Sequence, residues 1–386
     1  MKNILSAKVW VGVVFLVLCA AGLGLARHRA VWNDEIYTQI SSVEGKSYLN
    51  ILLGHIQEGS VSPLFYLMQK TTCSVLRYSS PIEWRTDMAF DDPFARIVLR
   101  LNSIFFMSLA VGAIFYFFYR FYSPLAGWYS LLVSLSSYMV WAFLAEGRPY
   151  ALWFFLTTVQ SLLYLYLIRQ GKDFRPAWNS LIATHLLLSL ASVFSIVQIV
   201  SVSFLLWFFL ERSHRRYILL TLIPSLICIY YYFHVPKYRF FFADGPVELV
   251  SANIPKDRFV LIFLFIVFVV LYFYQRKKNV RLIKTDLMKE GIAYLSLVGF
   301  MLLATGLILL KFKLAETAHT GFQISSRYFI YLTPLGVVAA TLFSLNMLKS
   351  LQGRRWLQTC LVLIIAFLLV FRIERTFLLI KGYYHL

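Results

Sequence analysis

The stretch IVLRLNSIFFMSLAVGAIFYFFY, residues 97–119, decides the fold. Apart from Arg100 it is uncharged, and about 20 apolar residues suffice for a helix to cross the hydrocarbon core of a bilayer. An arginine one turn inside such a span is costly unless it has a partner. We therefore expect Arg100 to contact either a carboxylate of the neighbouring loop or a lipid phosphate.

The whole chain has the composition of a membrane protein. It is 386 residues long, 60% hydrophobic and only 14% charged, which excludes an ordinary soluble globular domain. Its net charge of +19 would suit nucleic acid, but the bases stand in short clusters between apolar runs. Such clusters are typical of topology signals and of contacts to anionic lipid. The four cysteines lie far apart, so neither a zinc knuckle nor a disulfide framework is predicted.

The apolar runs predict an all-α polytopic protein, with residues 1–386 forming a single integral membrane domain of about eleven transmembrane helices. The predicted spans are 8–26, 97–119, 125–143, 150–168, 179–194, 196–211, 217–234, 259–275, 291–310, 328–348 and 356–372. Residues 179–211 are one apolar stretch, too long for one helix and short for two, so we expect a turn at Phe194-Ser195. Residues 97–234 would complete a first helical module, and 235–386 would supply the C-terminal helices.

The basic residues of the short loops favour a cytoplasmic N-terminus and an outer C-terminus. Residues 27–95 then form a large outer loop. Within it, the stretch from Pro63 to about Leu76 is interrupted by Gln69 and Lys70, which makes it too short and too polar to span. We expect a helix lying in the membrane interface, with Pro63 suited to its first turn.

Charged and aromatic side chains gather at the outer ends of the predicted spans. They are Asp34 and Glu35 after the first span, His55 in the outer loop, Glu146, Arg148 and Tyr150 between the third and fourth spans, and Arg327 and Tyr328 at the tenth. The guanidinium group of arginine can form a bidentate contact with a phosphate, which the ammonium group of lysine cannot. Arg148 and Arg327 therefore suit an anionic ligand. Asp34 could accept a proton from a hydroxyl, and Glu146 could orient an acceptor or a metal ion.

Each of these side chains also has a structural interpretation. Glu146 and Arg148 could form a local ion pair that holds a tight loop, and Arg327 could be an interfacial anchor. A lone histidine such as His55 is more often a surface residue than a metal ligand. The adjacent Asp34-Glu35 could be a solvated helix flank.

The order and spacing of these motifs resemble the GT-C superfamily of membrane glycosyltransferases, in the branch of the protein-O-mannosyltransferases and lipid A aminoarabinose transferases (family 39/83 type). The resemblance covers about residues 8–335. It rests on Asp34-Glu35, on Ser62-Pro63-Leu64-Phe65-Tyr66, on Arg100-Leu101, on Glu146-Gly147-Arg148-Pro149-Tyr150-Ala151, and on Arg327-Tyr328 followed by Pro334.

The resemblance implies a transferase that moves a sugar from a polyprenyl-phosphate donor to a lipid, glycan or protein acceptor, with inversion. It implies Asp34 as the catalytic base supported by Glu35, and a carrier phosphate held by Arg148 and Arg327, with Tyr328, Arg100 and Tyr150 beside them. Glu146, with His55, would shape the acceptor or metal site. The chemistry requires no cofactor, and a divalent metal stays open. The site would face the periplasm or exterior of a bacterial inner or plasma membrane.

This chain departs from the family where Val61-Ser62-Pro63-Leu64 replaces a His-Pro-Pro-Leu motif, which leaves the role of that histidine unassigned. Two other functions stay open. A flippase or transporter of lipid-linked saccharides also needs many spans and an arginine-lined cavity, but it often shows internal repeats, and none is visible. A non-catalytic membrane scaffold would need none of the acids and arginines.

Overall fold

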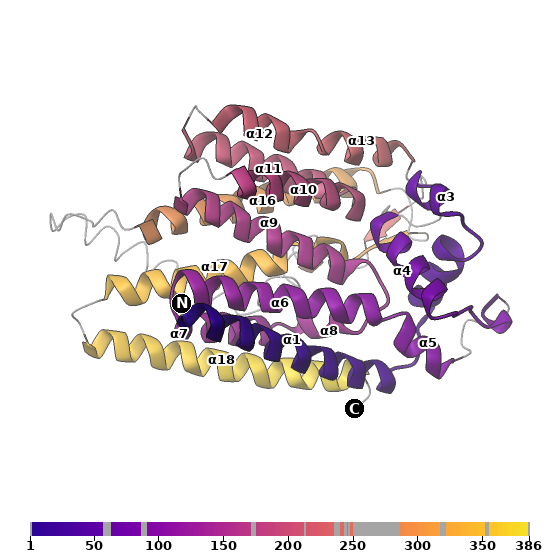
Figure 1. The fold of residues 1–386 in the computed structure, drawn as a ribbon, viewed down its shortest axis with the longest axis horizontal. Helices are drawn as coiled ribbons and strands as arrows, with labels where there is room; N and C mark the ends of the chain where they lie inside the picture. Colours follow the sequence, from indigo (N-terminus) through magenta and orange to yellow (C-terminus); the bar gives the residue numbers. More distant parts are fainter. Residues whose placement is uncertain are drawn as a thin grey trace.

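The computed structural model describes residues 2–56, 63–85, 91–170, 175–211, 214–234, 240–242, 245, 248–249, 286–316, 322–351 and 355–384. These residues form an all-α protein, with one short pair of strands, as the apolar runs predict. The helices run along the long axis of the molecule (Figure 1). The first helix begins in the left half of this view, and the last helix ends to the right of its middle, where the N and C marks stand (Figure 1).

The elements follow one another along the chain in this order: α1 Lys2–His28, α2 Asn33–Thr38, the π-helix η1 Gln39–Val43, α3 Tyr48–Leu52, α4 Pro63–Val75, the 3-10 helix η2 Ile82–Arg85, α5 Pro93–Val98, α6 Leu101–Phe121, α7 Pro124–Leu135, α8 Tyr138–Leu144, α9 Tyr150–Gln170, α10 Arg175–Ala191, α11 Ser195–Phe209, α12 Arg215–Leu222, α13 Ser225–His234, β1 Phe240–Phe242, α16 Asp286–Leu314, β2 Phe322–Ile324, the 3-10 helix η4 Ser326–Phe329, α17 Leu332–Ser350 and α18 Arg355–Tyr384. Helix α6 is central and packs against α1, α7 and α9.

Within the described residues, seven helices are long and apolar enough to cross a membrane, or eight if the bent pair α7 and α8 forms one span. The predicted eleven is therefore not confirmed. Residues 179–211 do form two helices, α10 and α11, which break within a residue or two of the expected turn. Both are shorter than 18 residues. The predicted span 259–275 lies outside the described residues.

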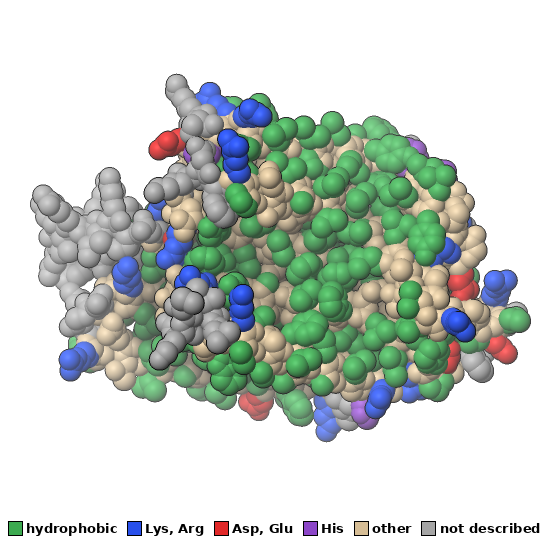
Figure 2. Space-filling model, in the orientation of Figure 1, with side chains coloured by type: hydrophobic (Ala, Val, Ile, Leu, Met, Phe, Trp, Pro, Cys, Tyr) green, Lys and Arg blue, Asp and Glu red, His purple; other side chains and the backbone are tan. Residues whose placement is uncertain are grey.

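The surface has the polarity that a membrane protein requires. On the face shown in Figure 2, hydrophobic side chains cover the middle of the molecule, and charged side chains collect toward its two ends. Exposed leucines, valines and phenylalanines on α1, α11, α13, α16 and α18 contribute to the apolar surface of the bundle. Apolar side chains exposed in this number are stable against lipid rather than water.

The third predicted span is broken: α7 and α8 meet at 70° around Ser136-Ser137. A break leaves backbone carbonyls without helical partners, and inside a membrane these must be satisfied by protein. Helix α18 supplies Thr376, whose hydroxyl donates to Ser136 O over 2.8 Å, and Trp141 Nε1 donates to Leu135 O over 2.7 Å. The last helix therefore stabilises the bend that carries the chain toward Glu146.

The elements between α1 and α6 gather at one end of the bundle, on the right in Figure 1. Helix α4 has 13 residues and begins at Pro63, which agrees with the helix predicted there and is too short to span. At the same end, β1 and β2 pair in parallel, with Phe241 opposite Gln323. This pairing fixes the segment just before Arg327.

Candidate functional site

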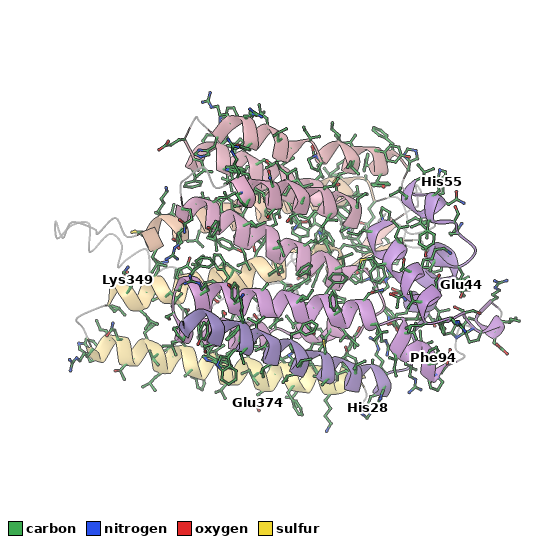
Figure 3. All side chains as sticks on the ribbon, viewed as in Figure 1. His28, Glu44, His55, Phe94, Lys349 and Glu374 are labelled. Atoms are coloured by element: carbon green, nitrogen blue, oxygen red, sulfur yellow. The ribbon has the colours of Figure 1, made fainter. Side chains whose placement is uncertain are left out.

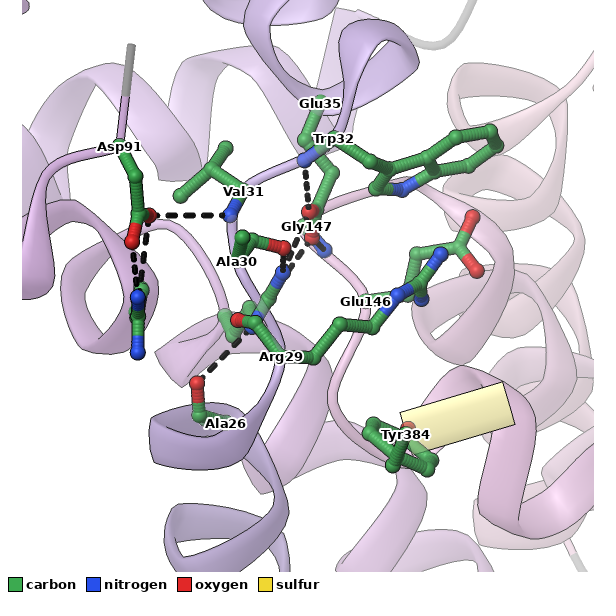
Figure 4. Close-up of polar contacts among 12 residues, drawn as sticks. Ala26, Arg29, Ala30, Val31, Trp32, Glu35, Asp91, Glu146, Gly147 and Tyr384 are labelled. Carbon is green, nitrogen blue, oxygen red and sulfur yellow. Dashed lines mark hydrogen bonds and ion pairs between the residues drawn. The ribbon is translucent and has the colours of Figure 1, made fainter. Parts of the chain in front are cut away.

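Glu35 and Arg100 form a buried ion pair where α1 ends and α6 begins. Arg100 Nε and Nη2 donate to the two Glu35 carboxylate oxygens over 2.9 and 2.6 Å, and both side chains are 0% exposed. The remaining Arg100 N–H groups donate to the carbonyls of Ala26, Arg29 and Ala30 over 2.7–2.9 Å. Figure 4 shows these contacts converging where α1 ends.

Of the two partners expected for Arg100, the structure has the carboxylate: Glu35, in the segment after α1. All five guanidinium N–H groups are used, so Arg100 has none left for a donor phosphate. Glu35 is equally occupied, because Gly147 N and Trp32 N also donate to it, over 2.5 and 3.2 Å. This geometry gives both residues a structural role that differs from the roles the resemblance implies.

Arg148 is buried and joins the loop before α9 to α2. Its Nη1 donates to Asp34 O over 2.9 Å and to the Thr38 hydroxyl over 2.8 Å. Its guanidinium carbon lies 5.7 Å from the centre of the Tyr150 ring. The charge of Arg148 is therefore held directly behind the peptide of Asp34.

Asp34 and Arg327 form an ion pair across a large sequence separation, with Arg327 Nη1 on Asp34 Oδ2. Their side chains keep 32% and 24% of their surface exposed. The Arg327 guanidinium also lies over the rings of Trp32 and Tyr328, at 5.5 and 5.8 Å. Asp34 is thus a carboxylate that solvent can reach, between one surface arginine and the buried Arg148.

Glu146 is buried near Glu35, Arg29 and Arg148 and is held from the last helix. Tyr383 on α18 donates its hydroxyl to Glu146 Oε2 over 2.7 Å. The Arg29 guanidinium stacks on the Tyr383 ring at 4.0 Å, and Figure 4 shows Arg29 pointing toward Glu146. Burial, reinforced by the nearby charge of Glu35, raises the pKa of the Glu146 carboxyl.

Aromatic rings pack among these charges. Tyr150 and Tyr328 meet edge to face with ring centres 6.4 Å apart, and both are buried. The Trp32 ring lies beneath two guanidinium groups, with Arg29 at 5.1 Å and Arg327 at 5.5 Å. Faces of this kind hold cations in place by their quadrupoles.

Several buried polar atoms at this end form no hydrogen bond with the described part of the chain. They are Arg29 Nη1, Trp32 Nε1, Glu146 Oε1, Ser325 Oγ and Arg327 Nε. Buried polar atoms are nearly always paired with protein or with a bound molecule. We therefore take this cluster, together with the half-buried carboxylate of Asp34, as the candidate site for a polar ligand.

The structure leaves His55 away from this cluster. His55 is exposed beyond α3 (Figure 3), where the backbone carbonyl of Leu52 accepts a hydrogen bond from Tyr231 on α13 over 2.6 Å. No described contact joins it to Glu146. Within the described ranges, no group of three or more histidine, cysteine, aspartate or glutamate side chains is arranged to hold a metal ion.

The remaining predicted residues come together: Asp34, Glu146, Arg148, Tyr150, Arg327 and Tyr328 surround one site. Sequence reasoning missed Arg29, Trp32 and Tyr383. An arginine and a tryptophan just after the first span were visible next to Asp34. Tyr383 had no local signal, because only the fold brings the end of the chain to Glu146.

No known protein family and no curated protein matches this chain.

Proposed function

We propose that the protein is a membrane glycosyltransferase that moves a sugar from a polyprenyl-phosphate donor to a lipid, glycan or protein acceptor on the outer face of the membrane. The observation that carries the proposal is the Asp34–Arg327 pair, with Arg148 bound to the Asp34 backbone and unsatisfied polar atoms around it. A carboxylate and two arginines at one end of a lipid-facing bundle suit a substrate with a hydroxyl, a phosphate and a hydrocarbon tail.

The reaction assigns a separate task to each group. Asp34 accepts the proton of the attacking acceptor hydroxyl, whose oxygen forms a new bond to the anomeric carbon from the side opposite the phosphate. The bond from that carbon to the phosphate oxygen breaks, and the lipid phosphate leaves with the electron pair. Arginine stabilises the charge that develops on the leaving oxygen, and inversion follows from the single displacement.

Arg327 is the better placed of the two arginines to meet the phosphate. It is partly exposed and has a buried Nε without a described hydrogen bond, whereas Arg148 is buried against Asp34 O and Thr38. A donor phosphate that attracts Arg327 also draws it off Asp34. Donor binding thereby frees the base for the acceptor hydroxyl.

The test is sugar transfer by purified wild-type protein and by Asp34→Asn, with a panel of polyprenyl-phosphate sugars as donors. We expect Asp34→Asn to lose transfer by at least about 10²-fold, the usual contribution of a general base, and to keep donor binding. Asp91→Asn is the matched control, because Asp91 also pairs with an arginine and is 28% exposed. Near-normal transfer by Asp34→Asn would refute the role of Asp34 as catalytic base. Inactivity of the wild type with every donor would refute the proposed glycosyltransferase activity.

A further inference from the structure

A second polar cavity lies in the segment between α2 and α5. It has a volume of about 510 Å³, within the size range of small-molecule sites. Its lining residues are Gln39, Val43, Glu44, Gly45, Lys70, Cys73, Ser74, Tyr78, Ser79, Ser80, Ile82 and Arg85. They come from η1, α4 and η2, at the end of the molecule where Figure 3 places Glu44.

The walls of this cavity are fixed by contacts between these elements. Glu44 Oε1 accepts a hydrogen bond from Ser80 N over 2.7 Å, which joins the end of η1 to the turn after α4. Gln39 Nε2 contacts Cys73 Sγ at 3.7 Å, on the buried side. Lys70 is held over the Tyr48 ring at 5.4 Å. The cavity is therefore part of the folded structure, not a gap beside a loose loop.

Two buried hydroxyls help to hold the wall together. Tyr78 is only 9% exposed. Its hydroxyl and that of Ser80 lie within reach of each other, and the described residues otherwise give neither of them a hydrogen bond. Because both oxygens are buried, they support the wall, and a ligand would meet the more exposed polar groups beside them.

The charges of the wall favour an anion. Lys70 and Arg85 contribute two positive charges, and the one carboxylate, Glu44, already accepts the Ser80 N–H. Serine, tyrosine and glutamine side chains supply the rest of the polar surface. A basic pair beside many hydroxyls matches a phosphate or carboxylate carried on a hydroxyl-rich group.

We propose that this cavity binds an anionic, hydroxyl-bearing head group at a site separate from the Asp34–Arg327 pair. Thr38, which accepts a hydrogen bond from Arg148, is followed directly by Gln39 of the cavity wall. At about 1.5 Å per residue, Asp34 and Gln39 lie only about 7 Å apart along the helix axis. The head group is then the polar end of the acceptor; this last assignment rests on the proposed function, whereas the binding does not.

Binding is tested without any donor, on protein in phosphatidylcholine nanodiscs, by titration with a hexose 6-phosphate. Free hexose and inorganic phosphate are the comparison probes. We expect the hexose phosphate to bind more tightly than either probe, and Lys70→Gln/Arg85→Gln to weaken it at least about tenfold. Arg77→Gln, an exposed arginine outside the wall, should leave it unchanged.

Nanodiscs that contain phosphatidylglycerol distinguish the two sources of the head group. If phosphatidylglycerol competes with the hexose phosphate, the site binds a lipid head group; if it does not compete, the site binds a saccharide. Equal binding by the double variant, or no binding by the wild type, overturns the site. Binding that persists in Asp34→Asn, with no transfer by the wild type, refutes the proposed function alone.

Discussion

Arg100 donates to Glu35 through two nitrogens and uses its three other N–H groups on the last carbonyls of α1 and the turn after it. One side chain thus closes the end of the first helix, neutralises a buried carboxylate and begins α6. Because Gly147 donates to the same carboxylate, the pair also sets the position of the neighbouring Arg148. The site is built on this pair.

Replacing Arg100 by methionine should destabilise the fold strongly. It leaves Glu35 as an unpaired buried charge, and removing one partner of a buried pair costs about 3–5 kcal/mol. Arg96→Met is the control, since Arg96 and Asp91 are 27% and 28% exposed and such pairs contribute about 0–1 kcal/mol. Unfolding of the detergent-solubilised variants measures the loss of stability in each. A similar loss of stability in Arg100→Met and Arg96→Met would contradict the structural role of Arg100.

Gly147→Ala should disturb the same region from the other side. A Cβ at this position would lie 2.9 Å from Leu99 O and 3.2 Å from Glu35 Oε1, which is too close for either. We expect lower thermal stability and reduced transfer. Gly112→Ala is the matched control, because its Cβ would meet only Val11 Cγ1 at 3.7 Å and alanine is the better helix former by about 1 kcal/mol. A stable, fully active Gly147→Ala would argue against this packing.

The sequence was sufficient to predict the helices that its apolar runs make long and continuous, such as α1, α9 and α17. It also suggested a carboxylate partner for Arg100, because the cost of a charge inside a span is independent of the fold. The breaks were harder to foresee. The bend at Ser136-Ser137 depends on α18 to satisfy the freed carbonyl, and this partner lies far away in the chain.

Candidate site residues were predictable where polar side chains follow a span, as Asp34 and Arg148 do. The different roles of Asp34 and Glu35 were not predictable. Neighbours in sequence, Asp34 and Glu35 point to different partners, Arg327 and Arg100. On a helix, adjacent residues are about 100° apart and face different surroundings. Which of the two is exposed depends on tertiary packing, which periodicity does not report.

Glu146 should make stability depend on pH. Because burial raises the pKa of its carboxyl above the ordinary 4.5, the folded state holds this proton more tightly than the unfolded state does. Stability should therefore decline as pH rises from about 4.5 through the folded-state pKa. Glu146→Gln should flatten that decline, and melting temperatures between pH 4 and 8 measure it.

Asp91 gives the opposite sign and serves as the comparison. Its hydrogen bond to Arg96 lowers the pKa of its carboxyl below the ordinary 3.8, so the stability it adds is present at neutral pH and is lost as pH falls below about 4. Asp91→Asn should thus cost a little stability at pH 7 and less as the pH falls below about 4. Identical pH profiles for wild type and Glu146→Gln would show that Glu146 does not titrate in this range.

His55 and Lys349 should lie on opposite sides of the membrane, as they lie at opposite ends of the bundle (Figure 3). Each is exposed, so a cysteine there can react with a membrane-impermeant maleimide. A Cys360→Ser background removes the exposed native thiol. We expect His55→Cys to be labelled in intact cells and Lys349→Cys only after permeabilisation. The reverse pattern would invert the proposed orientation.

Arg327→Ala should weaken binding of the donor while leaving the fold intact. Arg327 is partly exposed and joins Asp34 across the site, so its loss removes a phosphate contact without leaving a deeply buried charge. A hydrogen bond to a charged group contributes about 1.5–3 kcal/mol, which corresponds to roughly 10- to 150-fold in donor affinity. Arg327→Lys keeps the positive charge but not the bidentate geometry of the guanidinium group, so it should retain part of that affinity. Titration with the polyprenyl-phosphate sugar measures all three proteins, and unchanged affinity in Arg327→Ala would move the phosphate site elsewhere.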